Sequence, residues 1–297
     1  YRDWFLGDWL APHGVDTGSE ASVSLVNNCF VSDCYARMAQ MARLTGHDDE
    51  AAAFEARREA LNRTIHARFY DPATQTYATG SQLDMTYPML VGATPDSLRA
   101  GVEQRLFRLT HDVMKDHIGG GLVGVPVITR WAVRSHNPEF IYRMLKQRGY
   151  PGYLHMIDHG ATATWEYWSG ERSRVHNCYN GIGTWFYQAL GGLRTDSSHP
   201  GYEHVFIDPQ IPEGVEWCRI GKETPYGRID LGWEIADGEL RIDVTLPPGV
   251  TATAITPAGA CRGRLDGRRL APQSPGTKIA SGRHRLVFGL APQNAGR

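Results

Sequence analysis

The chain has 297 residues, 21% of them charged, 41% hydrophobic and 10% aromatic, with a formal net charge of −1. That length can bury a sizeable core in one or two domains, and the composition argues against a disordered chain. The charge balance, without a basic stripe, argues against nucleic acid as a partner, and no apolar run reaches the roughly 18 residues of a membrane span.

The first 195 residues are predicted to be mainly helical. Residues 1–22 read as an irregular segment around Gly7-Asp8-Trp9, and ordered loops of this kind often carry binding residues. Apolar residues at three- and four-residue steps predict a helical hairpin over about 24–69 that turns at Gly46, with two small strands expected over 71–77. Further helices are expected over 82–92, 96–117, 122–134, from Pro138 to before Gly149, and over 179–193.

Paired helices of modest length, joined by loops rich in glycine, aspartate and aromatic residues, suit an α/α toroid. In such a fold, hairpins circle a central funnel and the loops at one end carry the chemistry. A generic helical repeat array is the alternative, but no fixed repeat period is present. The expected first domain is therefore a toroid over residues 1–195.

The composition changes near residue 196, where residues 195–201 have the composition of a linker. Short alternating runs separated by turn signals such as Asp237-Gly238 then predict an antiparallel β-sandwich of about seven strands over residues 196–297. The strands are expected at 205–207, 215–220, 228–235, 240–246, 250–255 and 284–288.

The densest chemistry lies in residues 151–185, where Trp165-Glu166-Tyr167-Trp168 is followed by His176-Asn177. A carboxylate among indole rings loses hydration and becomes easier to protonate, which suits proton transfer. Aromatic faces suit the C–H faces of a sugar ring, and Glu, His and Asn suit its hydroxyls. A Trp-rich core turn with Glu166 pointing to solvent remains the alternative interpretation, because structural networks also hold such carboxylates.

Metals, cofactors and disulfides are not expected. The five cysteines are an odd number, widely spread and without a CxxC pair, so they are predicted to be free buried thiols. The spacing of His155, Asp158 and His159 fits no standard metal site. The opening residues YRDWFLGDWL lack the basic region of a signal peptide, and bacterial cytoplasm and periplasm both remain open as compartments.

Three stretches together resemble the α-L-rhamnosidases of glycoside hydrolase family 78. They are Gly7-Asp8-Trp9-Leu10 before a helical hairpin, the run from Gly160 to Glu166 followed by Trp168, and His176-Asn177 before a helix ending Gly191-Gly192-Leu193. The resemblance implies an (α/α)6 toroid followed by a β-sandwich, and an enzyme that releases terminal α-L-rhamnose with inversion from rhamnose-containing glycosides or oligosaccharides.

The same resemblance assigns roles to single residues. Glu166 is expected to be the general base that activates water. Tyr167 departs from the family, many of whose members have Arg at that position. Substrate-binding roles are expected for Asp8, Trp9, Trp165, Trp168, His176 and Asn177.

Inverting hydrolysis needs a second carboxyl group, about 6.5–9.5 Å from the first. In the family, the general acid lies upstream of the GDW segment, so the chain is expected to be the C-terminal portion of such an enzyme, with an incomplete toroid and the N-terminal part as its partner. Asp3, Asp16 and Glu20 are the internal candidates for the acid. A non-catalytic carbohydrate-binding protein, or a toroid glycosidase acting on another terminal sugar, are the alternative functions.

Overall fold

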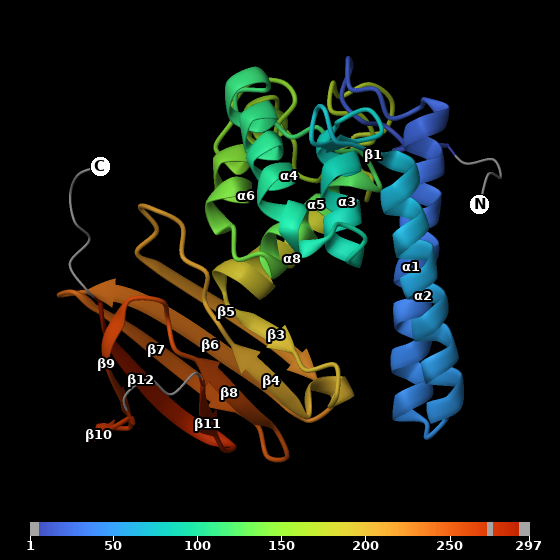
Figure 1. The fold of residues 1–297 in the computed structure, drawn as a ribbon. Helices are drawn as coiled ribbons and strands as arrows, with labels where there is room; N and C mark the ends of the chain where they lie inside the picture. The colour runs from blue at the N-terminus through green and yellow to red at the C-terminus, as the bar shows by residue number, and fades with distance from the viewer. Residues whose placement is uncertain (1–5, 272–275, 291–297) are drawn as a thin grey trace. The chain divides into compact units, whose positions relative to one another are not determined.

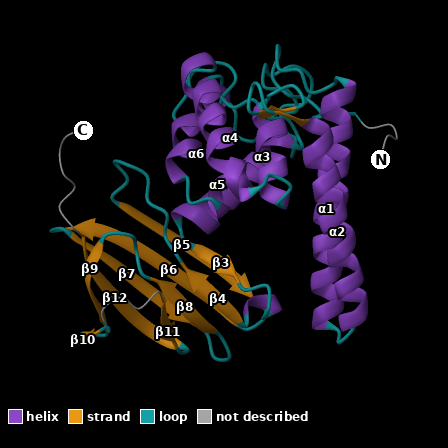
Figure 2. Cartoon of the chain, viewed as in Figure 1, coloured by secondary structure: helices purple, strands orange, loops and turns teal. Residues whose placement is uncertain are grey.

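The computed structural model describes residues 6–271 and 276–290, and the chain divides into two compact units between Gly183 and Thr184. The first unit is helical and the second is built mainly from strands (Figure 2). The domain boundary predicted from composition, at residue 195, lies further along the chain than this division and stays a prediction.

The first unit opens with the expected helical hairpin, α1 (Glu20–Leu44) and α2 (Asp48–Phe69), whose helices lie side by side (Figure 1). Ser19 caps α1 by accepting a hydrogen bond from the Ser22 amide. Several apolar residues that gave the sequence its helical period are nevertheless exposed, Phe30 and Met41 among them. The periodicity identified the helix correctly, but the face that this unit buries is instead lined by small and polar residues beside Leu25 and Val26.

The next helices follow the predicted order: α3 (Gln82–Val91), α4 (Asp96–Arg108), α5 (Gly124–Arg134) and α6 (Pro138–Leu145). Every residue of α3 is buried, and α3 packs against both α1 and α5, so it forms the centre of this unit. Strands β1 (Tyr70–Asp71) and β2 (Thr76–Tyr77) pair as the expected small hairpin.

Two helical predictions were wrong in detail. The helix expected over 96–117 ends at Arg108 and continues only as a π-helical turn, Leu109–Val113. The helix expected over 179–193 is broken into a 3-10 turn (Asn180–Ile182), α8 (Gly183–Trp185) and a π-helical turn (Phe186–Leu190), after which the chain becomes strand β3. A short helix, α7 (Tyr153–Asp158), was not predicted.

The second unit is a two-sheet sandwich. One sheet has the order β10-β9-β12-β7-β6-β5 and the other β11-β8-β4-β3. Neighbouring strands are antiparallel except β4 and β8, which pair in parallel, a detail that the sequence did not indicate. The strands are β3 (Leu193–Thr195), β4 (His204–Ile207), β5 (Trp217–Thr224), β6 (Gly227–Ala236), β7 (Glu239–Leu246), β8 (Thr251–Ile255), β9 (Ala260–Leu265), β10 (Arg268–Arg269), β11 (Gly276–Ile279) and β12 (Gly282–Leu290).

Alternating side chains from both sheets fill the sandwich core. Ile229, Leu231 and Trp233 of β6 point inward, where they meet Val205 and Ile207 of β4. The Trp233 indole N–H donates to the Leu190 carbonyl at 2.7 Å, which satisfies the polar atom of a buried ring. In the part of the chain that the structure describes, no helix is both long and apolar enough to cross a bilayer.

Candidate active site

The Glu166 segment folds back on itself as a loop held by backbone hydrogen bonds. The Glu166 amide donates to the Ser173 carbonyl at 2.9 Å, and the His176 amide donates to the Thr164 carbonyl at 2.8 Å. The Thr164 hydroxyl adds a hydrogen bond to the His176 carbonyl. These bonds pair residues 164–166 with residues 173–176, so Glu166 and His176 lie on two neighbouring segments of one loop.

Cys178 contacts His176 and lies near the charge of Glu166. Its Sγ lies 3.0 Å from His176 Nδ1. Burial raises the pKa of the Cys178 thiol, and the nearby negative charge of Glu166 raises it further. The thiol therefore stays protonated, and it lies close to both the imidazole and the carboxylate of the candidate site.

Tyr179 joins this loop to the GDW segment. Its hydroxyl lies 2.9 Å from the Leu10 carbonyl oxygen and 3.1 Å from the Glu166 carbonyl oxygen, and these two acceptors share its single proton. The Tyr179 ring stacks on Trp168, with the ring centroids 3.9 Å apart. Two of the three motifs singled out in the sequence, far apart along the chain, therefore meet at one tyrosine hydroxyl.

Asp8 anchors the GDW segment from the other side. One carboxylate oxygen accepts from the Gly121 amide at 2.7 Å, and the other accepts from the Val123 and Gly124 amides at 2.9 and 2.7 Å. These amides lie at the start of α5, where backbone N–H groups have no partner inside the helix. The side chain is only 3% exposed, so Asp8 acts as a long-range cap for α5.

The glycines of this turn are required by the close approach of Asp8 and Trp9. A Cβ on Gly124 would come within 2.3 Å of Asp8 Oδ2, and a Cβ on Gly121 would come within 2.3 Å of the Trp9 carbonyl oxygen. The Leu122 amide also donates to that carbonyl at 2.8 Å. The glycine-rich turn is therefore the support on which the GDW segment rests.

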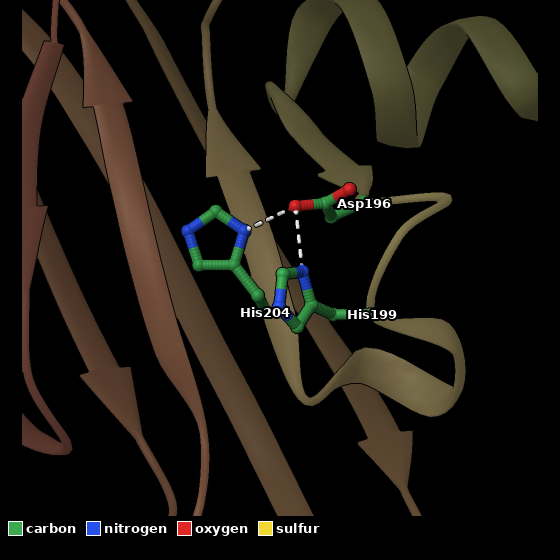
Figure 3. A group of neighbouring side chains, drawn as sticks. All are labelled: Asp196, His199 and His204. Carbon is green, nitrogen blue, oxygen red and sulfur yellow. Dashed lines mark hydrogen bonds and ion pairs between the residues drawn. The ribbon is translucent and has the colours of Figure 1, made fainter. Parts of the chain in front are cut away.

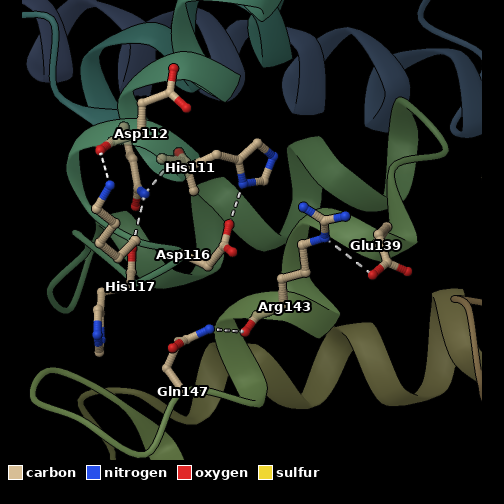
Figure 4. A network of polar contacts seen from close by, with 10 residues as sticks. His111, Asp112, Asp116, His117, Glu139, Arg143 and Gln147 are labelled. Atoms are coloured by element: carbon tan, nitrogen blue, oxygen red, sulfur yellow. Dashed lines mark hydrogen bonds and ion pairs between the residues drawn. The ribbon is translucent and has the colours of Figure 1, made fainter.

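The Gln82 side chain also holds the glycine-rich turn, at its N-terminal end. Its side chain accepts from the Gly119 amide at 2.7 Å and donates to the Thr110 hydroxyl at 3.0 Å and the His117 carbonyl at 3.2 Å. The chain between the π-helical turn and the glycines is also held by local contacts, and His111 and Asp116 point toward one another there (Figure 4). The glycine-rich turn is thus fixed at both ends.

The predicted site residues differ in their solvent exposure. Trp9 is 39% exposed and Asn177 is exposed, while Glu166 and His176 are half-buried. Trp165 and Trp168 are each only 2% exposed. The Trp168 indole N–H donates to the Gly120 carbonyl at 3.0 Å, whereas the Trp165 indole N–H has no acceptor among the described residues.

Of the three internal candidates for the general acid, the structure describes Asp16 and Glu20. Asp16 is exposed and accepts a hydrogen bond from the Ser19 amide at 3.2 Å. Glu20 is exposed in the first turn of α1, where an acidic residue favours the helix. Asp3 lies outside the described residues. Both described candidates therefore have a local structural role at the start of α1.

A hollow in the second unit lies apart from the motif residues in sequence. It has a volume of about 1090 Å³ and lies over the outward side chains of the six-stranded sheet, and Trp217 and Arg285 are among its lining residues. It contains none of the motif residues. The candidate site is the Glu166 group (Glu166, His176, Cys178 and Tyr179), which is identified by its chemistry and by the convergence of the sequence motifs.

The ionisation of Asp8 gives a pH dependence that can be tested. Burial raises its pKa to about 6, although the amides of Gly121, Gly124 and Val123 oppose the shift. An unfolded Asp titrates near 3.9, so the folded chain binds more protons between about pH 4 and 6. The free energy of unfolding should therefore fall by about 3 kcal/mol as the pH rises through this window, and then level off.

Urea unfolding of the wild type and of Asp8→Asn across pH 4 to 8 measures this contribution. The asparagine cannot titrate, so the difference between the two proteins should change across the window. Parallel pH profiles for the two proteins would contradict the assignment.

Sequence comparison identifies the two parts of the chain. Residues 1–190 match the family described as the bacterial alpha-L-rhamnosidase 6 hairpin glycosidase domain, and residues 192–268 match the bacterial alpha-L-rhamnosidase C-terminal domain. An alpha-L-rhamnosidase of Alteromonas sp. (strain LOR) is 25% identical over 271 residues, which are 85% of this chain and 29% of that protein. One from Formosa agariphila is 24% identical, over 83% of this chain and 28% of that protein.

Structural comparison agrees on the fold. The crystal structure of Streptomyces avermitilis alpha-L-rhamnosidase complexed with L-rhamnose superposes with a TM-score of 0.84 and 22% identity, over 97% of this chain and 28% of that one. The chain thus spans less than a third of the length of these relatives, and the expected fold class, a toroid-type helical domain followed by a sandwich, is confirmed. On the match to residues 1–190, the chain belongs to the bacterial alpha-L-rhamnosidase 6-hairpin glycosidase family.

Proposed function

We propose that this chain forms the general-base half of the active site of an inverting glycosidase that releases terminal α-L-rhamnose. The observation that carries the proposal is the pairing of Glu166 and His176 on one loop, tied through Tyr179 to the exposed Trp9 segment. A carboxylate, an imidazole and an exposed indole suit an attacking water, a sugar hydroxyl and a sugar face. Family membership and the relatives named alpha-L-rhamnosidase support the substrate class.

In this proposal Glu166 removes a proton from a water molecule, which attacks the anomeric carbon from the face opposite the departing group. A second carboxyl group protonates the glycosidic oxygen, and the two groups stand about 6.5–9.5 Å apart to leave room for the water. Because Asp16 and Glu20 serve the start of α1, we infer that the acid comes from a further part of a longer protein. The exposed apolar side chains of α1, such as Phe30 and Met41, are suited to contact that part.

The remaining predicted site residues divide into two roles. Trp9, His176 and Asn177 reach the surface, and we infer that they contact the sugar. Asp8 and Trp168 are buried and bind the glycine-rich turn through the Gly121 and Gly120 groups, so we infer that they position the GDW segment and the loop instead. Trp165 is packed under Gly170, where a Cβ would come within 2.7 Å of its ring, and it belongs with the supporting residues.

The test uses the protein expressed from the complete reading frame that contains these residues. A panel of aryl glycosides should show hydrolysis of the α-L-rhamnoside, and NMR of the first-formed sugar should show the inverted anomer. Preference for another glycoside would reject the substrate class, and a retained anomer would reject the mechanism. Sugar binding without hydrolysis would support the alternative of a carbohydrate-binding protein.

Replacing His176 by alanine should weaken rhamnose binding more than it slows the chemical step. A hydrogen bond from a fixed imidazole to a sugar hydroxyl contributes about 1.5–3 kcal/mol when charged, or roughly 10- to 100-fold in affinity. Calorimetry with free rhamnose measures the change, and His159→Ala is the control because His159 is exposed directly after the end of α7. Unchanged affinity in the His176 variant would remove that residue from the sugar site.

A further inference from the structure

A cluster of two histidines and an aspartate lies at the end of the β3–β4 hairpin in the second unit. Strands β3 and β4 pair in antiparallel fashion, with Thr195 opposite Val205. One step further, the Asp196 amide donates to the His204 carbonyl at 3.3 Å, so these two residues face each other across the hairpin. The connection then turns back, and the His199 amide donates to the Asp196 carbonyl at 3.2 Å.

The three side chains converge on one point. Asp196 Oδ2 lies 3.0 Å from His204 Nδ1 and 3.1 Å from His199 Nδ1, and both rings present Nδ1 to the same oxygen (Figure 3). One ligand atom from each residue lies within 4.8 Å of the others. Bond lengths of 2.0–2.1 Å at tetrahedral angles separate the ligands of a zinc ion by about 3.3 Å, so the observed spacing is close to that of a metal site.

Neighbouring groups hold the ligands in this orientation. The other Asp196 oxygen, Oδ1, accepts from the Ser198 amide at 2.8 Å, which leaves Oδ2 toward the imidazoles. His204 Nε2 lies 3.0 Å from the Thr253 hydroxyl on the neighbouring strand β8. When Nε2–H donates to Thr253, Nδ1 carries the lone pair on the side of Asp196 and is free to bind an ion, and metal-binding histidines are commonly fixed in this way by their second nitrogen.

We propose that Asp196, His199 and His204 bind one divalent transition-metal ion of the zinc class through Oδ2 and two Nδ1 atoms, with water as a further ligand. Two imidazoles and one carboxylate are the donor set that such ions take, whereas Mg²⁺ and Ca²⁺ prefer oxygen ligands. His199 is half exposed, at 52% of its side chain, and this leaves one side of the site open to solvent. The ion would link β3, β4 and the connection between them.

The sequence did not suggest this site, because residues 195–201 read as a linker. The proposal is independent of the glycosidase assignment, since all the residues that it uses belong to the second unit, whereas Glu166 and His176 belong to the first. A hydrogen-bonded triad without metal, in which Oδ2 accepts an N–H from each ring, is the competing arrangement.

Zinc binding measured by calorimetry separates the two arrangements. The untagged, chelator-treated chain should carry Cys34→Ser, because Cys34 is an exposed thiol and thiolates are zinc ligands. We expect one bound ion per chain and a zinc-dependent rise in Tm. Thr253→Val should raise the zinc Kd about 10- to 100-fold, and His199→Gln should raise it further. His199 is exposed, so its replacement leaves the fold intact.

His284→Gln is the matched control, because His284 pairs with Asp266 alone, at 2.8 Å, on the same unit. It should leave zinc affinity and the Tm rise unchanged. The proposal is overturned if the parent chain binds no stoichiometric zinc, or if His199→Gln binds zinc as tightly as His284→Gln. Competition by equimolar Mg²⁺ would also overturn the assignment to the zinc class.

Discussion

Replacing Glu166 by glutamine should lower the kcat of rhamnoside hydrolysis by about 100- to 10,000-fold, the usual contribution of a general base. Glutamine has the same size as glutamate and leaves the backbone hydrogen bonds of the loop in place. The backbone amide of residue 166 donates to the Ser173 carbonyl, and its backbone carbonyl accepts from the Tyr179 hydroxyl. Among the described residues, the Glu166 side chain accepts one long hydrogen bond, 3.3 Å from the Ser173 amide, so the fold should be preserved. Steady-state kinetics of the intact protein, with circular dichroism as a check on folding, measure the effect.

Glu171→Gln is the matched control for this variant. Glu171 is an exposed carboxylate on the same loop, five positions further on, and its removal changes the local charge by the same amount. Its turnover should stay near that of the wild type. Near-normal turnover in the Glu166 variant, or an equal loss of turnover in both variants, would contradict the assignment of Glu166 as the general base.

Replacing Asp8 by alanine should lower the free energy of unfolding by about 3–5 kcal/mol, because each buried donor that loses its acceptor costs about 1–3 kcal/mol. Three backbone N–H groups, of Gly121, Val123 and Gly124, would be left without their acceptor in a buried place. Asp8→Asn keeps one acceptor oxygen but presents an amide N–H to a backbone N–H, so it should cost about 1–3 kcal/mol. Urea unfolding at pH 7 gives both values.

Asp16→Ala serves as the comparison within the same segment. Asp16 is exposed and accepts a single amide hydrogen bond, from Ser19, so its loss should change stability by about 0.5 kcal/mol. If Asp8→Ala were as mild as Asp16→Ala, the anchoring of the GDW segment by the carboxylate would be rejected. Because Asp8 holds the segment that carries Trp9, its loss should also weaken rhamnose binding in whatever fraction remains folded.

Local patterns predicted the long elements of this fold well. The α1–α2 hairpin and the long strands β6 and β7 each contain enough residues for their periods to be recognised, and clear turn signals such as Gly46 and Asp237-Gly238 separate them. Short elements failed for the opposite reason. The six residues of α7 and the two of β10 carry too few positions for a period, and the parallel pairing of β4 with β8 depends on residues far apart in sequence.

The sequence by itself determined the family, and it predicted a general base at Glu166, because Trp165-Glu166 and His176-Asn177 lie in an order and spacing that can be recognised locally. Only the tertiary structure decided what Asp8 and Tyr179 do. The partners of Asp8 are backbone amides more than a hundred residues away, and backbone amides leave no mark in a sequence. The convergence of Asp196, His199 and His204 was likewise decided by strand pairing, which turns a segment that reads as a linker into a cluster of three ligands.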